Sequence, residues 1–386
     1  MGAPQSRLYE TAIGLKNTGW EVVVITALPN YPTGKIFSQY KKRFFTKETL
    51  NEIQVWRYLL YASNSKKSFP RILSMFSFSL MVLFSIFKVR NFKPGFIFTE
   101  CPPLTLGVSG ILLAKFSRSK HIMNVSDLWP LSAYELGAIS KGFLYNRLES
   151  LETFLYNKSY ACTGQSEEII TYIAQKGAKK TVLFRNGVDS SRFTISRDID
   201  INAIQGKIKI VYAGLLGVAQ GILELCKNIN FSALNCEFHI YGQGAEKNGI
   251  AIFVAENSNN GIYLHEPIDR DLVPAALMKF DATIIPLIKP IFGAVPSKIY
   301  EAMAAGLPIV FSGGGEGAMI IKKYDLGWIC NPSDFNDIKS VLLKLSEMPI
   351  NDLTERKKRA ITIATNVFDR QIQIGKLNHF LIKELN

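Results

Sequence analysis

The residues Ser297, Lys298 and Glu301 form the chain's clearest pattern for binding a phosphorylated ligand. Ser297 is expected to cap a helix, with Lys298 in its first turn and Glu301 one turn further on. A helix start offers free N–H groups and a partial positive charge to a phosphate, and Lys298 adds a full charge. Glu301, on the same side, would accept hydrogen bonds from sugar hydroxyls. One helix turn would then hold the phosphates and ribose of a nucleotide, although the same spacing also fits a plain surface ion pair.

Three glycine-containing turns are expected on one rim of the second half of the chain, each after a predicted strand. Their residues are Gly214, Gly217, Gly242, Gly244, Gly314, Gly315 and Glu316. Glycine lets a backbone approach a ligand closely, and a helix that starts after such a turn can bind phosphate. Each turn alone is common between strands and helices, but three on one rim favour a ligand site.

The first half of the chain places Asp127 directly after a predicted strand. A single carboxylate there is either a turn or helix-capping residue or a group that binds substrate. Pro102 and Pro103 follow the preceding strand and would form a stiff turn on the same rim, with a structural or a functional role. Trp129 follows Asp127 by two residues.

Strands and helices alternate through both halves, which predicts the α/β class with parallel, doubly wound sheets covered on both faces. The predicted strands are 20–26, 53–58, 95–99, 121–125, 159–163 and 180–184, then 208–213, 236–241, 261–264, 282–285, 307–311 and 327–329. Two such series predict two Rossmann-like domains that face an interdomain cleft, with ligands beyond the C-terminal strand ends. The expected division is a first domain 1–188, a linker 189–206, a second domain 207–366, and a C-terminal helix 367–386 that returns to the first domain.

The beginning of the chain lacks one expected element. A helical pattern comes first and a strand follows, whereas a βαβ unit begins with a strand. Gly2 resembles the remnant of a glycine loop that follows such a strand. We therefore expect that the first strand of the N-terminal sheet is missing, and that an upstream start would add roughly 15 residues.

Composition narrows the class of protein and its partners. A hydrophobic content of 47% with 20% charged residues, over 386 residues, indicates a folded protein of about two domains. The five cysteines are scattered, so neither a disulfide framework nor a structural zinc site is expected, and a reducing cytoplasm fits. The net charge of +13 calls for an anionic partner, and its basic residues gather in the first half. An anionic membrane or a phosphorylated substrate is favoured over nucleic acid, for which no motif is present.

The most apolar stretch, residues 72–87, is shorter than the roughly 20 residues that span a bilayer. It is expected to be a buried core helix or a helix at a membrane surface, with a true span as the third alternative.

The sequence contains no Gly-x-Ser-x-Gly elbow, no phosphate loop ending in Gly-Lys-Ser/Thr and no His-Glu-x-x-His. Its motifs instead resemble the retaining glycosyltransferases of family 4, which have the two-domain GT-B fold, and among them bacterial enzymes of O-antigen, colanic-acid and exopolysaccharide assembly. The resemblance covers almost the whole chain. It is carried by residues 2–4, 7–10, 29–32, 102–103, 127–130, 186–189, 212–214, 219–221, 241–244 and 296–308.

The resemblance implies a role for each candidate residue. Glu301 would hold the donor's ribose, while Lys298 and the amides around Ser297 would face its diphosphate. The glycine turns, with residues 314–317 nearest the sugar or phosphates, would complete the donor site, and Gly2 would lie beside the leaving phosphate. Asp127 would lie near the transferred sugar or the acceptor, in a region shared with Pro102, Pro103 and Trp129.

Three departures from the family pattern place more weight on Lys298 and Glu301. The family often has a second glutamate where this chain has Gly293, and an arginine and a lysine where residues 215–220 have neither. Asp127 stands where a cleft histidine is usual.

The implied activity is transfer of a sugar, with retention of configuration and without a metal or cofactor, from a nucleotide sugar. A UDP-N-acetyl-sugar is preferred to a GDP-sugar as donor. The expected acceptor is a saccharide on undecaprenyl diphosphate, reached by a cytoplasmic protein peripheral on the anionic inner-membrane surface. The alternatives are a non-catalytic, membrane-associated sugar-binding or scaffold protein, a truncated inactive transferase, and a UDP-sugar epimerase.

Overall fold

The computed structural model describes residues 3–31, 33–65, 68–193 and 206–385, which form two compact units. Unit 1 comprises Met1–Arg185 and Ile374–Asn386, and unit 2 comprises Asn186–Gln373. The predicted domain boundary at 188 therefore moves to 185. The reason is local pairing in unit 2, where the Val188 N–H donates to the Phe368 carbonyl and the Arg370 N–H donates to the Val188 carbonyl. Of the predicted linker, residues 194–205 lie outside the described residues.

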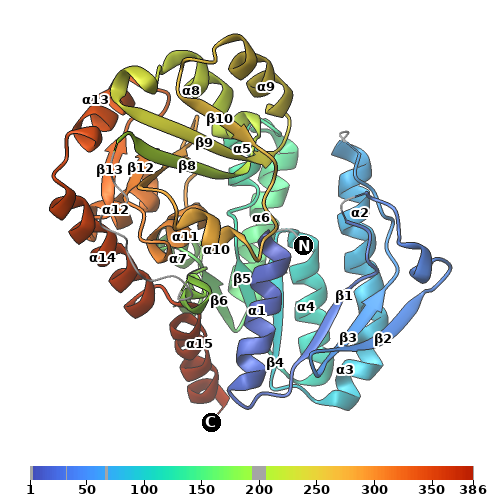
Figure 1. Cartoon of the computed structure of the whole chain (residues 1–386). Helices are drawn as coiled ribbons and strands as arrows, with labels where there is room; N and C mark the ends of the chain where they lie inside the picture. The colour runs from blue at the N-terminus through green and yellow to red at the C-terminus, as the bar shows by residue number, and fades with distance from the viewer. Residues whose placement is uncertain (1–2, 32, 66–67, 194–205, 386) are drawn as a thin grey trace. The chain divides into compact units, whose positions relative to one another are not determined.

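Unit 2 is built on one parallel sheet of six strands in the order β10-β9-β8-β11-β12-β13 (Figure 1). The strands are β8 (Ile208–Leu215), β9 (Cys236–Gln243), β10 (Ile262–His265), β11 (Ala282–Pro286), β12 (Ile309–Ser312) and β13 (Gly327–Cys330). Runs of β-branched residues such as Ile208–Val211 and Thr283–Ile285 explain these central strands, since such residues pack well on both faces of a buried sheet. All six were predicted, with ends that shift by one or two residues.

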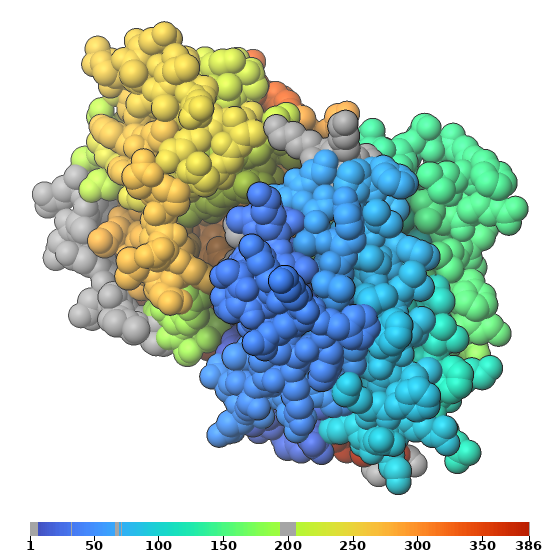
Figure 2. Space-filling model, turned by 90° about the vertical axis from the view of Figure 1, so that its right-hand side faces the viewer, coloured from blue at the N-terminus to red at the C-terminus, as the bar shows by residue number. Residues whose placement is uncertain are grey.

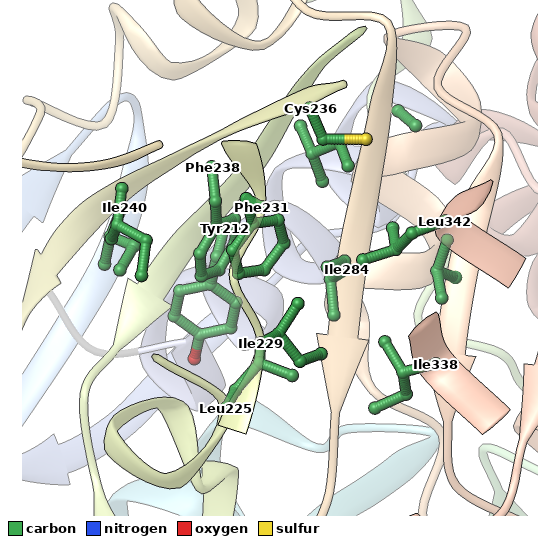
Figure 3. Packing of buried hydrophobic residues seen from close by; sticks show 14 of the residues in the cluster. Tyr212, Leu225, Ile229, Phe231, Cys236, Phe238, Ile240, Ile284, Ile338 and Leu342 are labelled. Atoms are coloured by element: carbon green, nitrogen blue, oxygen red, sulfur yellow. The ribbon is translucent and has the colours of Figure 1, made fainter. Parts of the chain in front are cut away.

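Two hydrophobic cores cover the two faces of this sheet. On one face Tyr212, Phe238 and Ile284 pack against α8, α13 and the loop residues around Phe231 (Figure 3). On the other face Val211, Ile285 and Phe311 pack against α10, α11, α12 and α14. The helices are α8 (Ile222–Asn228), α9 (Lys247–Glu256), α10 (Val273–Leu277), α11 (Ser297–Ala304), α12 (Gly315–Lys323), α13 (Phe335–Ser346) and α14 (Ile350–Asn366). Alternate residues of one strand thus enter different cores, as strand geometry requires.

Unit 1 contains two separate sheets, in the orders β1-β3-β2 and β4-β5-β6-β7. The strands are β1 (Val23–Ala27), β2 (Phe45–Leu50), β3 (Ile53–Tyr58), β4 (Phe96–Cys101), β5 (Lys120–Val125), β6 (Ala161–Gly164) and β7 (Thr181–Leu183). All pairings are parallel except that of β2 with β3, a hairpin that the sequence analysis did not predict. The expectation of purely parallel sheets is therefore wrong at this hairpin.

The helices of unit 1 are α1 (Ala3–Asn17), α2 (Ser68–Met81), α3 (Ile86–Phe92), α4 (Leu104–Ser117), α5 (Leu131–Glu135), α6 (Phe143–Lys158) and α7 (Glu167–Gln175). The single helix expected over residues 72–87 is divided by the 3-10 turn η2 (Val82–Ser85). The last helix, α15 (Arg370–Leu385), enters unit 1 from Ile374 onward, where Leu377 and Leu381 pack on Ile122 of β5.

The two sheets of unit 1 share their covering layers. Val23 and Ile25 of β1 pack in the same cluster as Ile97 of β4, and Trp20 before β1 contacts the Phe96 ring at 5.8 Å. Among the described residues, β1 pairs only with β3, and β4 pairs only with β5. Each of these two strands therefore has one edge without a described partner strand.

A buried acid lies in the core under β5 and β6. Glu152 of α6 is 0% exposed and accepts hydrogen bonds from the hydroxyls of Tyr156 (2.8 Å) and Tyr172 (3.1 Å). Burial raises the pKa of the Glu152 carboxyl to about 7, because the charged form loses its hydration.

Candidate functional site

Lys298 and Gly214 form the centre of the candidate site in unit 2. A Cβ built at Gly214 would lie 2.3 Å from both Cε and Nζ of Lys298, so the ammonium group occupies space that only glycine leaves open. The same Nζ lies 5.5 Å from the centroid of the Tyr212 ring, within reach of a cation–π interaction. Burial lowers the pKa of the Lys298 ammonium, and the negative charge of Glu301 opposes that shift. A phosphate bound here would offset the cost of burying this charge.

Glu301 lines the same recess as Lys298, together with Ala213 and Thr283. Both charged residues project from α11, whose Ile299 and Met303 are fully buried and fix the helix against the sheet. The helix ends at Ala304, and Gly306, two residues later, has a φ of +70° that favours glycine. The sequence-based arrangement of Lys298 and Glu301 on one side of a helix start is therefore present in the structure.

Ser297 does not cap α11, which corrects the sequence prediction. Pro296 occupies the cap position without a side-chain capping hydrogen bond, and Ser297 is the first helical residue, exposed to solvent. Because the proline side chain has no hydrogen-bond acceptor, the first helical N–H groups are left to other partners. The amides at Ser297 and Lys298 thus remain at the helix start, as the phosphate hypothesis requires.

Gly242 and Gly244 allow the turn after β9 to pack closely against the turn after β8. A Cβ at Gly242 would lie 2.0 Å from the Gly214 carbonyl oxygen, and one at Gly244 would lie 2.2 Å from that of Leu216. The Leu216 N–H donates to the Gln243 carbonyl at 3.0 Å, and the Glu246 N–H donates to the Leu216 carbonyl at 2.9 Å. The turn after β9 therefore supports the turn after β8, and this packing alone accounts for both glycines. Gly217 follows in the first of these turns, at the start of a short 3-10 helix (Val218–Gln220).

The third turn leads into α12. Gly314 is its cap residue, and Gly315 has a φ of +63° that favours glycine. Glu316, in the first turn, is only 2% exposed, and an acid at this position interacts favourably with the helix dipole. A Cβ at Gly317 would lie 3.1 Å from Ile299 of α11, so the two helix starts are neighbours.

In unit 1, Asp127 follows β5 and its side chain is exposed. Desolvation by the surrounding protein raises the pKa of its carboxyl, while the charge of Arg7 lowers it. Pro102 and Pro103 lie beside it, since the Ser126 N–H donates to the Cys101 carbonyl at 2.9 Å. Trp129 is half-buried and packs on the core that contains Leu128.

A polar network that the sequence analysis missed holds this rim. Arg7 of α1 donates to Glu100 at the end of β4 and to the Ser126 hydroxyl, and Glu100 also accepts from that hydroxyl. The Gln165 amide donates to the Ser126 carbonyl at 2.6 Å, which fixes the backbone directly before Asp127. These residues are far apart in sequence, so no local pattern signals the network.

The structure thus brings together the predicted donor residues of unit 2 in one group and Asp127, Pro102, Pro103 and Trp129 of unit 1 in another. Gly2 lies outside the described residues. Within the described part of the chain, no three His, Cys, Asp or Glu side chains form a group that could hold a metal ion. The five cysteines are all buried and free.

Comparison with known proteins identifies a family model and curated relatives that this chain resembles. Residues 207–348 match the family model described as "Glycosyl transferases group 1". The chain is 26% identical over 330 residues to the putative colanic acid biosynthesis glycosyl transferase WcaI of Escherichia coli K12, covering 81% of this chain and 78% of that protein. It is 24% identical over 246 residues to the probable glycosyltransferase WbjE of Pseudomonas aeruginosa, covering 61% and 62%.

Solved structures show the same fold. Sucrose-phosphate synthase from Thermosynechococcus elongatus aligns with a TM-score of 0.74 at 16% identity, covering 99% of this chain and 94% of that one. The Anabaena protein HepE, solved in complex with UDP and glucose, aligns with a TM-score of 0.67 at 14% identity, covering 99% and 96%. These neighbours have two Rossmann-like domains, which confirms the predicted fold class. Residues 207–348 are thus similar to the group 1 glycosyltransferases, and both curated relatives are named as glycosyltransferases.

Proposed function

We propose that this chain transfers a sugar from a nucleotide-sugar donor, preferably a UDP-N-acetyl-sugar, to a lipid-linked saccharide in O-antigen, capsule or exopolysaccharide biosynthesis. Transfer retains the anomeric configuration and uses neither a metal nor a cofactor. The acceptor is a saccharide on undecaprenyl diphosphate, which places the protein on the cytoplasmic face of the inner membrane. The relative named for colanic acid biosynthesis and the HepE complex with UDP support this choice of pathway and donor.

The observation that carries the proposal is the position of Lys298, which lies at the start of α11 and beside Gly214 of β8. Glu301 follows one turn further along the same helix. A cation held over a glycine turn is preorganised for a diphosphate that passes close to the backbone. Because the ammonium is already desolvated, its attraction for a phosphate is stronger than that of a surface lysine.

In this mechanism Lys298 and the amides at the start of α11 stabilise the negative charge that grows on the departing diphosphate. Glu301 accepts hydrogen bonds from the ribose hydroxyls and so fixes the donor's position. Asp127 contacts the transferred sugar or the acceptor hydroxyl, and Gln165 holds the backbone before it through the Ser126 carbonyl. The acceptor hydroxyl bonds to the anomeric carbon on the face from which the diphosphate departs and gives its proton to the departing phosphate oxygen, so no protein nucleophile is required.

The test is a donor screen with the purified protein. We expect release of UDP from one UDP-N-acetyl-sugar, detected by mass spectrometry, when a lipid-linked saccharide extract is added, and weaker or no release from GDP-sugars. Proton NMR of the product should show the donor's anomeric configuration. Binding of a nucleotide sugar without turnover, with every acceptor fraction and with a start-extended version of the chain, would select the non-catalytic sugar-binding alternative.

A further inference from the structure

The helical segment formed by α2, η2 and α3 exposes large apolar side chains along its length. They are Phe69 (75% exposed), Ile72 (55%), Leu73 (38%), Met75 (42%), Phe76 (47%), Leu80 (45%), Phe84 (59%) and Phe87 (74%), which we call the outer face. A soluble helix normally buries such residues and exposes polar ones. Figure 2 views unit 1 from the side on which the first part of the chain, in blue and light blue, covers the surface.

The inner side of the segment is partly polar, which makes the outer face more unusual. Among its described side chains, the four buried ones are Ser79, Val82, Ser85 and Val89. The Ser79 hydroxyl lies 2.8 Å from that of Thr105 on α4, and the Ser109 hydroxyl of α4 donates to the Ser79 carbonyl at 2.6 Å. Apolar side chains of the segment also pack inward, since Val82 and Val89 belong to a core cluster that Phe78, Met81, Ile86 and Phe92 contact. The segment is therefore apolar on its outer face in addition to its packed inner side, which indicates that the outer face is adapted to a surrounding that is not water.

Neighbouring elements extend the apolar surface. α4 packs against both α2 and α3, and it exposes Leu112 (37%) and Phe116 (54%). Phe44, 46% exposed, meets the Phe84 ring edge-on with 5.2 Å between the centroids. The outer face is therefore part of a larger patch and not a row of isolated side chains.

The charges around this patch have one sign. Residues 68–93 and 104–118 contain no aspartate or glutamate. Five exposed cations flank the apolar side chains at the α3 and α4 ends: Lys88, Arg90, Lys93, Lys115 and Arg118. An apolar face with a cationic rim matches an anionic lipid surface, where acyl chains meet negative headgroups. It does not match a second copy of this chain, because two such rims would repel each other.

The segment is long and apolar enough to cross a bilayer, since residues Ile72–Phe92 contain an 18-residue stretch with a mean hydropathy of 2.0, of which 22% is buried. Its contacts favour a different placement. Ser79 and Ser109 bind it lengthwise to α4, and the 3-10 turn η2 interrupts it. Crossing the bilayer would expose these serines and the α4 face to lipid, whereas lying in the interface keeps both contacts.

We propose that the outer face, with Leu112, Phe116 and the five flanking cations, inserts into the headgroup region of an anionic membrane, with α2 and α3 lying in the membrane plane. This placement rests on the proposed function only in that it brings unit 1 to a lipid-linked acceptor. The docking itself requires no catalysis.

The test is cosedimentation of the full-length chain with phosphatidylcholine vesicles that either contain or lack phosphatidylglycerol. We expect strong binding only when phosphatidylglycerol is present. The double variant Phe84→Ser/Phe87→Ser should bind at least about tenfold more weakly, because two inserted rings are lost. The double variant Arg90→Gln/Lys115→Gln should bind the vesicles roughly fivefold more weakly for each charge removed. Added salt should reduce the difference in binding between this variant and the unchanged chain.

Matched controls lie in unit 2. Ile252→Ser/Leu272→Ser removes two apolar side chains that are each 60% exposed, and Lys279→Gln/Lys344→Gln removes two exposed charges. Both should bind vesicles like the unchanged chain, and circular dichroism should show that all variants are folded. Equal binding by the Phe84→Ser/Phe87→Ser variant and its control would overturn the proposal. Resistance of the bound protein to alkaline extraction would also overturn it, because such resistance indicates a membrane span. A dimer of the unchanged chain that only Phe84→Ser/Phe87→Ser abolishes would overturn it as well. UDP release with a water-soluble acceptor should persist in every variant, which separates a failure of docking from a failure of the transferase assignment.

Discussion

The Lys298 ammonium group occupies the space that a side chain at position 214 would need. A Cβ built at Gly214 would lie 2.3 Å from the Lys298 Nζ. Gly214 lies near the end of β8 and Lys298 lies in the first turn of α11, so neither residue indicates this site alone. Their proximity turns a common glycine turn into a specific site for a cation.

Gly214→Ala should therefore disable the donor site without unfolding unit 2. The added methyl displaces the Lys298 ammonium, and kcat/KM for the donor should fall by about 10²-fold, the usual cost of losing one preorganised stabilising group. Gly375→Ala is the matched control, because a Cβ there meets nothing within 4 Å in helix α15. Steady-state kinetics with both variants provide the measurement, and an active Gly214→Ala enzyme would remove Lys298 from the mechanism.

Glu301→Ala should weaken donor binding through the ribose. A hydrogen bond to a charged acceptor contributes about 1.5–3 kcal/mol, so Kd for the nucleotide sugar should rise roughly tenfold to a hundredfold. The sharper measurement uses a donor analogue whose ribose lacks both hydroxyls. The unchanged enzyme should discriminate strongly against it, whereas Glu301→Ala should bind both donors equally. Discrimination that survives in Glu301→Ala would show that another group holds the ribose, and Glu355→Ala on α14 serves as the surface control.

Arg7→Ala should shift the acid limb of the pH–rate profile upward. The Arg7 charge lowers the pKa of Asp127, so its removal lets desolvation raise that pKa further. If turnover needs the ionised carboxylate, the rate in the variant should fall at a higher pH than in the unchanged enzyme. Arg57→Ala, which breaks the Arg57–Glu48 ion pair elsewhere in unit 1, should leave the limb in place. An unshifted limb in Arg7→Ala would restrict the network to a structural role.

Glu152 should make the stability of unit 1 depend on pH. Its folded pKa is raised from 4.5 to about 7, so between these values the folded state binds more protons than the unfolded state. The free energy of unfolding should therefore fall as the pH rises through this range and level off above about 7. Glu152→Gln has no proton to lose and should flatten this dependence in urea titrations. An equally steep dependence in the variant would assign it to other groups.

The central strands and the α11 site were predictable because their signals are local. Short apolar runs that alternate with helical patterns predicted all six strands of unit 2, and a three-residue spacing placed Lys298 and Glu301 on one side of a helix. β2 was missed because Phe45–Leu50 is a half-exposed edge strand with polar residues, which resembles a loop. Arg7 was missed because its partners Glu100 and Ser126 lie about a hundred residues away. Ser297 was assigned as a cap because capping preference does not reveal that Pro296 takes the position.

The close packing of Gly242 and Gly244 against the neighbouring turn also bears on how donor preference can change by mutation. These positions tolerate no added atom, so substitutions there should be lost to misfolding before they can alter specificity. Gly314 differs, since a Cβ there would meet only Pro290 at an ordinary 3.5 Å. Leu215 and Val218 are also open, at 61% and 67% exposure. A saturation library confined to Gly314, Leu215 and Val218 should therefore retain the most folded members and yield the new sugar preferences.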